Sequence, residues 1–169
     1  MFKKKSYSSF VKQRARRSLN KQMSRKIKTY VIDTSIAINR YLRKLIRKGL
    51  QGKIIIPNAV IAELENLANK GIEAGFLGLE EIARLQRVKN LHNIKIYFKG
   101  LRPGEHHIRY AKSGEIDAMI REIAVKNHAT LITADLVQAK SAQAYGIDVL
   151  FLKSKIEKKK RKKFFLFRK

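Results

Sequence analysis

Short apolar runs alternate along the chain with longer segments in which apolar residues recur at helical spacing. The runs are rich in Ile and Val and end at turn residues, which is typical of buried strands. The predicted strands are TYVI (29–32), KIIIP (53–57), IKIYF (94–98), TLIT (130–133) and DVLFL (148–152). Strands that alternate with helices predict an α/β fold with a mostly parallel central sheet and helices on both of its faces.

The segments between these strands predict five helices. The first spans 36–48, and the second begins at Pro57 and Asn58 and ends near Gly71. A glycine-containing turn over 71–78 is then expected to lead into a third helix at 79–88. The last two helices are predicted at 115–128 and in the segment that ends on Gly146, a favourable residue at a helix C-terminus.

Positive charge divides the chain into a body and two extensions. Of the 39 Lys and Arg residues, eleven lie in 1–28 without any acid and ten lie in 153–169 beside one acid, which leaves a net charge of only +6 on residues 29–152. Extensions of this kind bind polyanions or remain solvated. Apolar residues at every fourth position from Val11 to Ile27 are consistent with a basic amphipathic helix, and a disordered arm is the alternative.

Composition excludes several classes of protein. The chain has no Cys, which rules out disulfides and Cys-ligated zinc. No apolar run approaches the roughly 20 residues that span a bilayer, and the basic N-terminus is not followed by the apolar segment of a signal peptide. We therefore expect a soluble cytoplasmic protein with no membrane partner.

Four acids fall near strand ends or early in helices. Asp33 and Asp135 follow two predicted strands, Glu63 lies in the helix after the second strand, and Asp117 lies in the first turn of the helix at 115–128. Such positions converge at the carboxyl edge of a parallel sheet, where ligands bind. Each acid also has a simpler explanation, because Asp33 and Asp135 suit helix N-caps, the helix dipole favours Asp117, and Glu63 suits a helix surface.

Four stretches, in the same order, resemble the PIN domain, a family of metal-dependent ribonucleases: VIDTS (31–35), IPNAVIAELE (56–65), GEIDAMI (114–120) and LITAD (131–135). The resemblance covers about residues 29–152 and is greatest to the PIN domain of archaeal PilT-like ATPases that also carry a KH domain. It implies a three-layer PIN-like fold for 29–152, flanked by the basic segments 1–28 and 153–169. No P-loop and no GxxG motif follow here, so a partnership with an ATPase motor is not carried over.

The resemblance also implies a set of site residues. Asp33, Glu63, Asp117 and Asp135 match the acidic positions that bind Mg²⁺ or Mn²⁺ and carry catalysis, and Ser35 and Thr133 match the supporting hydroxyls. Clustered carboxylates repel one another strongly, so protons or cations must intervene. A hard divalent cation suits such all-oxygen ligands.

Histidines are weaker candidates. The adjacent pair His106 and His107 cannot easily share one face, and no third ligand follows at zinc-site spacing. Glu115 lies two residues from Asp117 and is better explained by the start of its helix.

The sequence therefore predicts a metal-dependent endoribonuclease that cleaves single-stranded or flexible RNA, with ribosomal RNA processing or the ribosome as its setting. Two alternatives remain open. One is a non-catalytic RNA-binding or ribosome-associated protein with a PIN fold, and the other is the toxin of a toxin–antitoxin pair. Homo-oligomerisation through the PIN-like domain, with a contribution from 69–90, is also expected.

Overall fold

The structure is a computed structural model that describes residues 27–110 and 114–153. Its strands and helices follow the predicted alternation. In chain order the elements are β1 (Thr29–Ile32), α2 (Thr34–Ile38), α3 (Tyr41–Arg47), β2 (Gly52–Pro57), α4 (Asn58–Asn69), α5 (Glu73–Val88), the 3₁₀ helix η1 (Lys89–His92), β3 (Ile94–Lys99), α6 (Glu105–Tyr110), α7 (Glu115–Lys126), β4 (Thr130–Thr133), α8 (Leu136–Ala144) and β5 (Val149–Phe151). The predicted basic helix of the N-terminal extension and the C-terminal extension lie outside the described residues.

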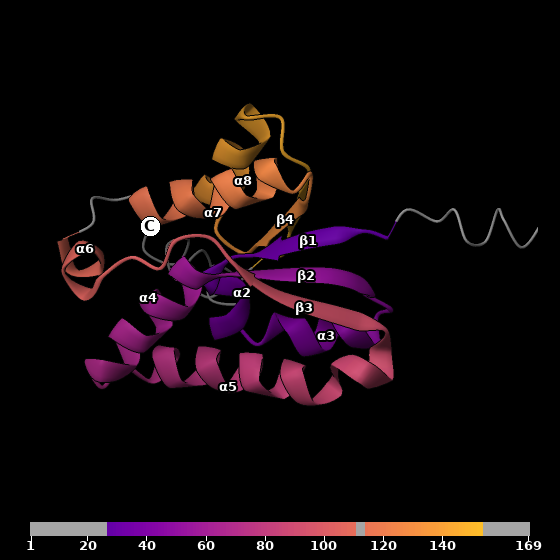
Figure 1. Ribbon diagram of the computed structural model, residues 1–169, viewed down its shortest axis with the longest axis horizontal. Helices are drawn as coiled ribbons and strands as arrows, with labels where there is room; N and C mark the ends of the chain where they lie inside the picture. The colour runs from indigo at the N-terminus through magenta and orange to yellow at the C-terminus, as the bar shows by residue number, and fades with distance from the viewer. Residues whose placement is uncertain (1–26, 111–113, 154–169) are drawn as a thin grey trace, which may run out of the picture.

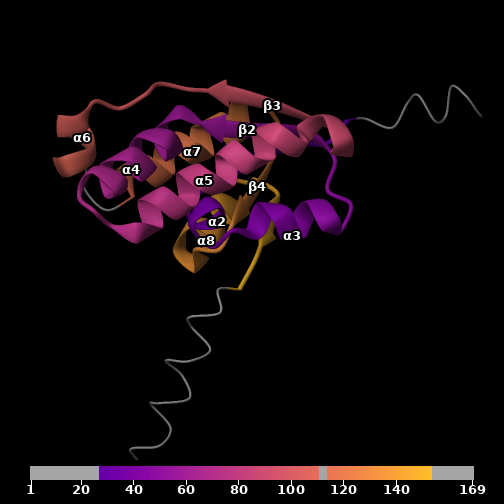
Figure 2. The ribbon, with the colours of Figure 1, turned by 90° about the horizontal axis from the view of Figure 1, so that it is seen from below.

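Five parallel strands form one sheet in the order β3-β2-β1-β4-β5. Helices α7 and α8 lie on one side of the sheet, and α3 and α5 lie on the other (Figures 1 and 2). The predicted α/β class and three-layer arrangement are confirmed. All five strands lie within two residues of their predicted bounds, and the bounds of TYVI and TLIT are reproduced in full.

The central strand β1 explains where a site can form. Its residues Val31 and Ile32 are completely buried, and both neighbours, β2 and β4, pair with it in parallel. The chain leaves β1 to build β2 and β3 on one side, and it returns to build β4 and β5 on the other. The order of the strands thus reverses between β1 and β4, and ligands bind at such a point beyond the carboxyl ends of the strands.

The structure divides one predicted helix into two shorter helices. The expected helix at 36–48 breaks between α2 and α3, where Arg40 has a left-handed backbone with φ of 54°. Asn39 closes α2, and its side-chain amide donates to the carbonyl of Ser35 at 2.7 Å. Neither Gly nor Pro marks the break in the sequence, so helical periodicity continues across it.

The predicted turn at 71–78 is wrong, because α5 begins at Glu73 and contains both Gly75 and Gly78. These glycines face α4 at close range. A Cβ atom on Gly75 would lie 2.3 Å from the backbone nitrogen of Ala68, and one on Gly78 would lie 2.3 Å from Cδ2 of Leu64. The glycines therefore allow two helices to approach closely, and this contact compensates their poor helix propensity.

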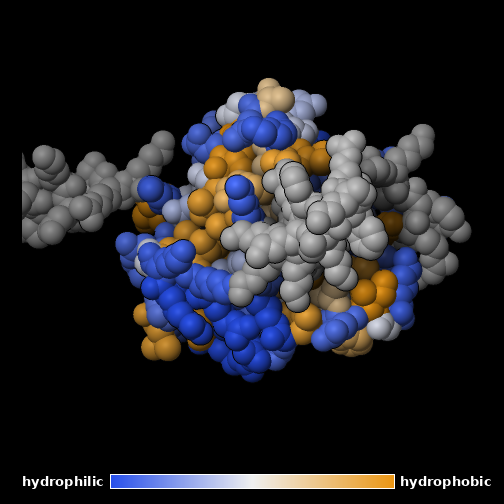
Figure 3. Space-filling view, turned by 180° about the vertical axis from the view of Figure 1, so that it is seen from behind, coloured by the Kyte–Doolittle hydropathy of each residue, from blue (hydrophilic) through white to orange (hydrophobic). Residues whose placement is uncertain are grey.

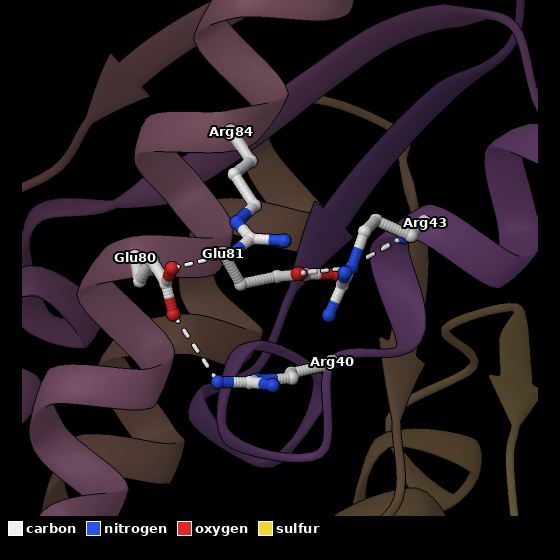
Figure 4. A network of polar contacts seen from close by, with 5 residues as sticks. All are labelled: Arg40, Arg43, Glu80, Glu81 and Arg84. Atoms are coloured by element: carbon white, nitrogen blue, oxygen red, sulfur yellow. Dashed lines mark hydrogen bonds and ion pairs between the residues drawn. The ribbon is translucent and has the colours of Figure 1, made fainter.

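Ion pairs join α5 to the segment around α3 (Figure 4). Glu80 contacts Arg40 at 3.1 Å and Arg84 at 2.5 Å. Glu81 is only 1% exposed; its Oε1 accepts the backbone N–H of Arg43 at 3.0 Å, and its Oε2 lies 2.9 Å from Arg43 Nε. The second contact has the distance of an ion pair without the angle of a hydrogen bond, so this buried carboxylate depends on the charge of Arg43.

The surface on the α3 and α5 side of the sheet is strongly hydrophilic. From behind, a hydrophilic area covers the lower left and lower centre of the molecule, and hydrophobic patches lie to its right (Figure 3). Exposed cations of these helices include Lys44, Arg47 and Arg87. Among the residues that the structure describes, no helix combines the length and apolarity needed to cross a bilayer.

Candidate active site

Asp33 is a buried carboxylate at the carboxyl end of β1. It is 4% exposed, and its backbone N–H donates to the carbonyl of Ile132 at 3.1 Å, which fixes it beside β4. Its Oδ1 accepts the backbone N–H of Thr34 at 2.7 Å. Its Oδ2 accepts the hydroxyls of Ser35 at 2.6 Å and Thr133 at 2.7 Å. Three donors thus offset the cost of burying this carboxylate and fix its orientation.

The two predicted supporting hydroxyls are themselves held in place. Ser35 Oγ accepts the backbone N–H of Ala134 at 2.9 Å, and Thr133 Oγ1 accepts that of Asp135 at 3.0 Å. Because each hydroxyl accepts a bond from the β4–α8 connection, its own proton is directed at Asp33. The structure therefore brings Ser35 and Thr133 to Asp33, as the resemblance implied.

Glu63 enters the site from the second turn of α4. Its Oε2 accepts the hydroxyl of Thr34 at 2.5 Å. Burial raises the pKa of Glu63 above the usual range; the hydrogen bond from Thr34 opposes the shift, and the negative charges of Asp33 and Asp117 add to it. Three of the four acids are therefore close enough to influence one another's charge.

Asp117 enters the site from the first turn of α7. Burial raises the pKa of Asp117, the charges of Asp33 and Asp135 raise it further, and Arg121 opposes the shift. The structure thus connects all four acids electrostatically, with Asp33 acting on both Glu63 and Asp117.

Asp135 caps a helix, as the sequence suggested, and its charge also acts on a second acid of the site. It is the N-cap of α8, and its Oδ1 accepts the backbone N–H groups of Val137 at 2.7 Å and Gln138 at 3.1 Å. Its charge also acts on Asp117, and the residue is exposed at the edge of the sheet. Capping engages only Oδ1, so this role is compatible with a ligand at Oδ2.

Two residues that organise the site were not predicted. Thr34 donates to Glu63, a contact that the sequence did not suggest. Gln138 is fully buried; its Nε2 donates to the backbone carbonyl of Asp117 at 3.2 Å, and its Oε1 accepts from Arg121 at 2.6 Å. It thereby fixes α8, which Asp135 caps, against α7, which carries Asp117. Thr34 could have been found from its place between two predicted site residues, whereas a single Gln on a helix gives no such signal.

The histidine pair belongs to a different part of the surface. His107 lies on α6 with its Nε2 3.7 Å from Glu115 Oε2, and both side chains are about half exposed. The pKa shifts of Glu63 and Asp117 come from burial and from other neighbours, and not from His106, His107 or Glu115.

The donor set fits a hard divalent cation. The side-chain donors are all carboxylate or hydroxyl oxygens. Burial is the main cause of the raised pKa of Glu63 and Asp117 and repulsion between the acids adds to it, and a bound cation would offset both effects by favouring the charged carboxylates. Within the described residues, no group of three or more acidic or histidine side chains is arranged to hold a metal ion. The oxygen chemistry of the donors suits Mg²⁺, which proteins typically hold through few carboxylates, with water and substrate as its other ligands.

Comparison with known proteins supports the resemblance to the PIN domain. The family model of the PIN domain matches residues 30–144. An uncharacterised KH and PIN-domain containing protein of Methanocaldococcus jannaschii is 43% identical over 129 residues, which are 75% of this chain and 20% of that protein. The Holliday junction branch migration ATPase of Sulfolobus acidocaldarius is 22% identical over 120 residues, 71% of this chain and 22% of that protein. The chain thus spans about a fifth of the length of these relatives.

A solved structure extends the comparison to three dimensions. It is a domain of a functionally unknown protein of Methanocaldococcus jannaschii, is 43% identical in sequence, and superposes with a TM-score of 0.71 over 75% of this chain and 92% of that one. PIN domains have a nuclease-like fold and are generally dependent on divalent metal ions. With a family model that matches most of the chain and a relative of this identity, the protein belongs to the PIN domain family.

Proposed function

We propose that this protein is an Mg²⁺- or Mn²⁺-dependent endoribonuclease that cleaves single-stranded or flexible RNA. The observation that carries the proposal is the buried Asp33 carboxylate, fixed by three donors and surrounded by acids whose pKa values respond to its charge. Capping accounts for Asp135 but does not account for the raised pKa of both Glu63 and Asp117.

Asp33, Asp117 and Asp135 would hold the cation, and Glu63 would complete the pocket. A bound divalent ion lowers the pKa of water and stabilises charge that develops on the phosphoryl group. Ser35 and Thr133 keep the Asp33 carboxylate in one orientation. Thr34 donates to Oε2 of Glu63, and Oε1 would accept a hydrogen bond from water.

Charge and one relative support RNA as the substrate. The net charge of +26 favours polyanions, and affinity that comes from neutralising phosphates must fall steeply as salt is added. The Methanocaldococcus relative carries a KH domain, a module that clamps single-stranded nucleotides. Ribosomal RNA is the target that we favour, because its processing suits a nuclease with this excess of Lys and Arg.

The test is cleavage of an end-labelled, partly structured RNA in Mg²⁺, Mn²⁺ or chelator. Asp33→Asn and Asp117→Asn proteins, each checked for folding, are compared with Glu115→Gln, a nearby acid that pairs with His107 instead. We expect metal-dependent cutting that Glu115→Gln retains and both Asp variants lose. Tight RNA binding without cutting, unchanged by either Asp substitution, would instead identify a non-catalytic, ribosome-associated RNA-binding protein.

A further inference from the structure

One side of the sheet is only partly covered. Helices α7 and α8 pack on that side against β1, β4 and β5, as the spatial arrangement in Figure 1 shows. The strands β2 and β3 extend beyond these helices. Alternation along a strand and the parallel register place Lys53, Lys95, Tyr97 and Lys99 on the same side, since Lys53 pairs with Lys95, Ile55 with Tyr97, and Pro57 with Lys99. We call these four residues the lysine–tyrosine face.

The lysine–tyrosine face contains a small hollow. Its volume is about 230 Å³, and it is lined by Thr29, Lys53, Ile55, Tyr97, Lys99 and Asn127. Tyr97 is 40% exposed on the edge strand β3, so its ring is accessible to a ligand. No acid lines the hollow, and Lys99 donates to Asn127 at 2.6 Å, which keeps its ammonium group at the rim.

Protection of an exposed sheet edge explains only part of this arrangement. Lysines on an edge strand prevent pairing with other sheets, and this accounts for Lys95 and Lys99 on β3. It does not account for Lys53, which lies on the inner strand β2, or for the exposed ring of Tyr97 between the lysines. An aromatic ring surrounded by ammonium groups is instead the combination that stacks on a nucleobase while neutralising the adjoining phosphates.

We propose that the lysine–tyrosine face binds single-stranded RNA outside the acidic edge and guides it towards that edge. A single strand fits because its bases are free to stack on a side chain, whereas those of a duplex are not. Lys95 and Lys99 are four residues apart, about 13 Å along the strand, which is far enough for them to contact different phosphates of one RNA strand. The choice of RNA over other single strands rests on the proposed function; the binding itself does not.

The face leads to the acidic edge. Lys99 ends β3, and the next residue, Gly100, accepts a hydrogen bond through its carbonyl from Asn58 Nδ2 at 2.7 Å. Asn58 is the first residue of α4, the helix that carries Glu63. Because all five strands are parallel, RNA that runs along β2 and β3 in the strand direction heads towards the carboxyl edge of the sheet, where the four acids lie.

The first experiment places a fluorescent probe on the lysine–tyrosine face. The 169-residue chain has no Trp, so Tyr97→Trp provides its sole indole. The control is Phe76→Trp, an exposed position (57%) on α5 on the other side of the sheet. Oligo(U) is titrated in chelator, which prevents cutting, and binding is followed separately by the anisotropy of labelled oligo(U).

We expect oligo(U) to quench the indole at 97 because bases stack on it, and to leave the indole at 76 nearly unchanged. Inorganic polyphosphate, which has charge without bases, should quench neither. Saturating oligo(U) that leaves the emission of Tyr97→Trp unchanged, or that quenches both variants equally, overturns the inference.

A second experiment measures affinity. Tyr97→Leu should weaken binding of oligo(U) by at least about fivefold, the lower bound for one lost base stack, whereas Tyr97→Phe should retain it. Lys95→Gln should lower the salt dependence by about one released counterion. Equal affinities of Tyr97→Leu and Tyr97→Phe contradict stacking. Cutting in Mg²⁺ is scored independently, so loss of this inference leaves the nuclease proposal standing, and failure to cut leaves the binding result intact.

Discussion

The hydroxyl of Thr133 offers a direct test of how Asp33 is held. Thr133 is completely buried and donates to Asp33 Oδ2 at 2.7 Å. Thr133→Val keeps the shape of the side chain and removes this donor. A hydrogen bond to a charged group contributes about 1.5–3 kcal/mol. The backbone N–H of Asp135 also loses its acceptor in a part-buried position, so we expect a total loss of about 2–4 kcal/mol.

Urea denaturation, with the slope compared between variants, measures this loss. Thr133→Ser is the matched control; it keeps the hydroxyl and should cost only about 1 kcal/mol for one buried methyl group. A double-mutant cycle with Asp33→Ala, which leaves no oxygen to accept the hydroxyl, separates the pairwise interaction from other effects and should give a coupling of about 1.5–3 kcal/mol. Equal losses for Val and Ser, together with a coupling near zero, would refute the view that Thr133 holds the carboxylate. In that case Thr133 only fills space.

Three other substitutions test the packing and the charges. Gly75→Ala should destabilise the protein by about 3 kcal/mol, because its Cβ would meet α4 backbone, whereas Gly104→Ala, with open space around it, should change stability by less than about 0.5 kcal/mol in the same denaturation assay. Arg43→Met should lower the free energy of unfolding by about 2–3 kcal/mol, because it leaves the Glu81 carboxylate unpaired. This loss is smaller than for a fully buried ion pair, because Arg43 is about one-third exposed. Arg43→Met combined with Glu81→Leu should recover part of the lost stability. In metal-free protein, the raised pKa of Glu63 means that protonation of this carboxyl favours the folded state. The free energy of unfolding, compared with that of Glu63→Gln, should therefore be greatest below the unfolded pKa of about 4.5 and should decline as the pH rises through the folded pKa. A difference between the two proteins that does not vary with pH would contradict this.

Strands and acids were predictable from the sequence because their signals are local. An apolar β-branched run such as TLIT is a strand in most environments, and its bounds are reproduced in full. That the four acids would lie near one another was predictable, because parallel strands present their carboxyl ends at one edge of the sheet. The raised pKa values of Glu63 and Asp117, to which the neighbouring acids contribute, agree with this proximity. Their catalytic role stays a prediction until cleavage is measured.

What could not be predicted depends on partners that are distant in the sequence. Gly75 and Gly78 suggested a turn because glycine is a poor helix former, but their effect on packing against α4 outweighs that propensity. The left-handed Arg40 gives no local signal, since its conformation is fixed by the helices on either side and by contact with Glu80. Gln138 is informative only once α7 and α8 are known to touch.

The close packing of α4 on α5 has a consequence for the spacing of the acids. Leu64 sits where Gly78 leaves room, and the next residue towards the N-terminus is Glu63. A slide of α4 by one residue would move Glu63 about 1.5 Å along the helix axis, enough to break its 2.5 Å contact with Thr34. The position of Glu63 therefore depends on Gly78, a residue of a helix that supplies none of the four acids. A methyl group added at Gly78 would displace Leu64 and Glu63 without contacting the acids.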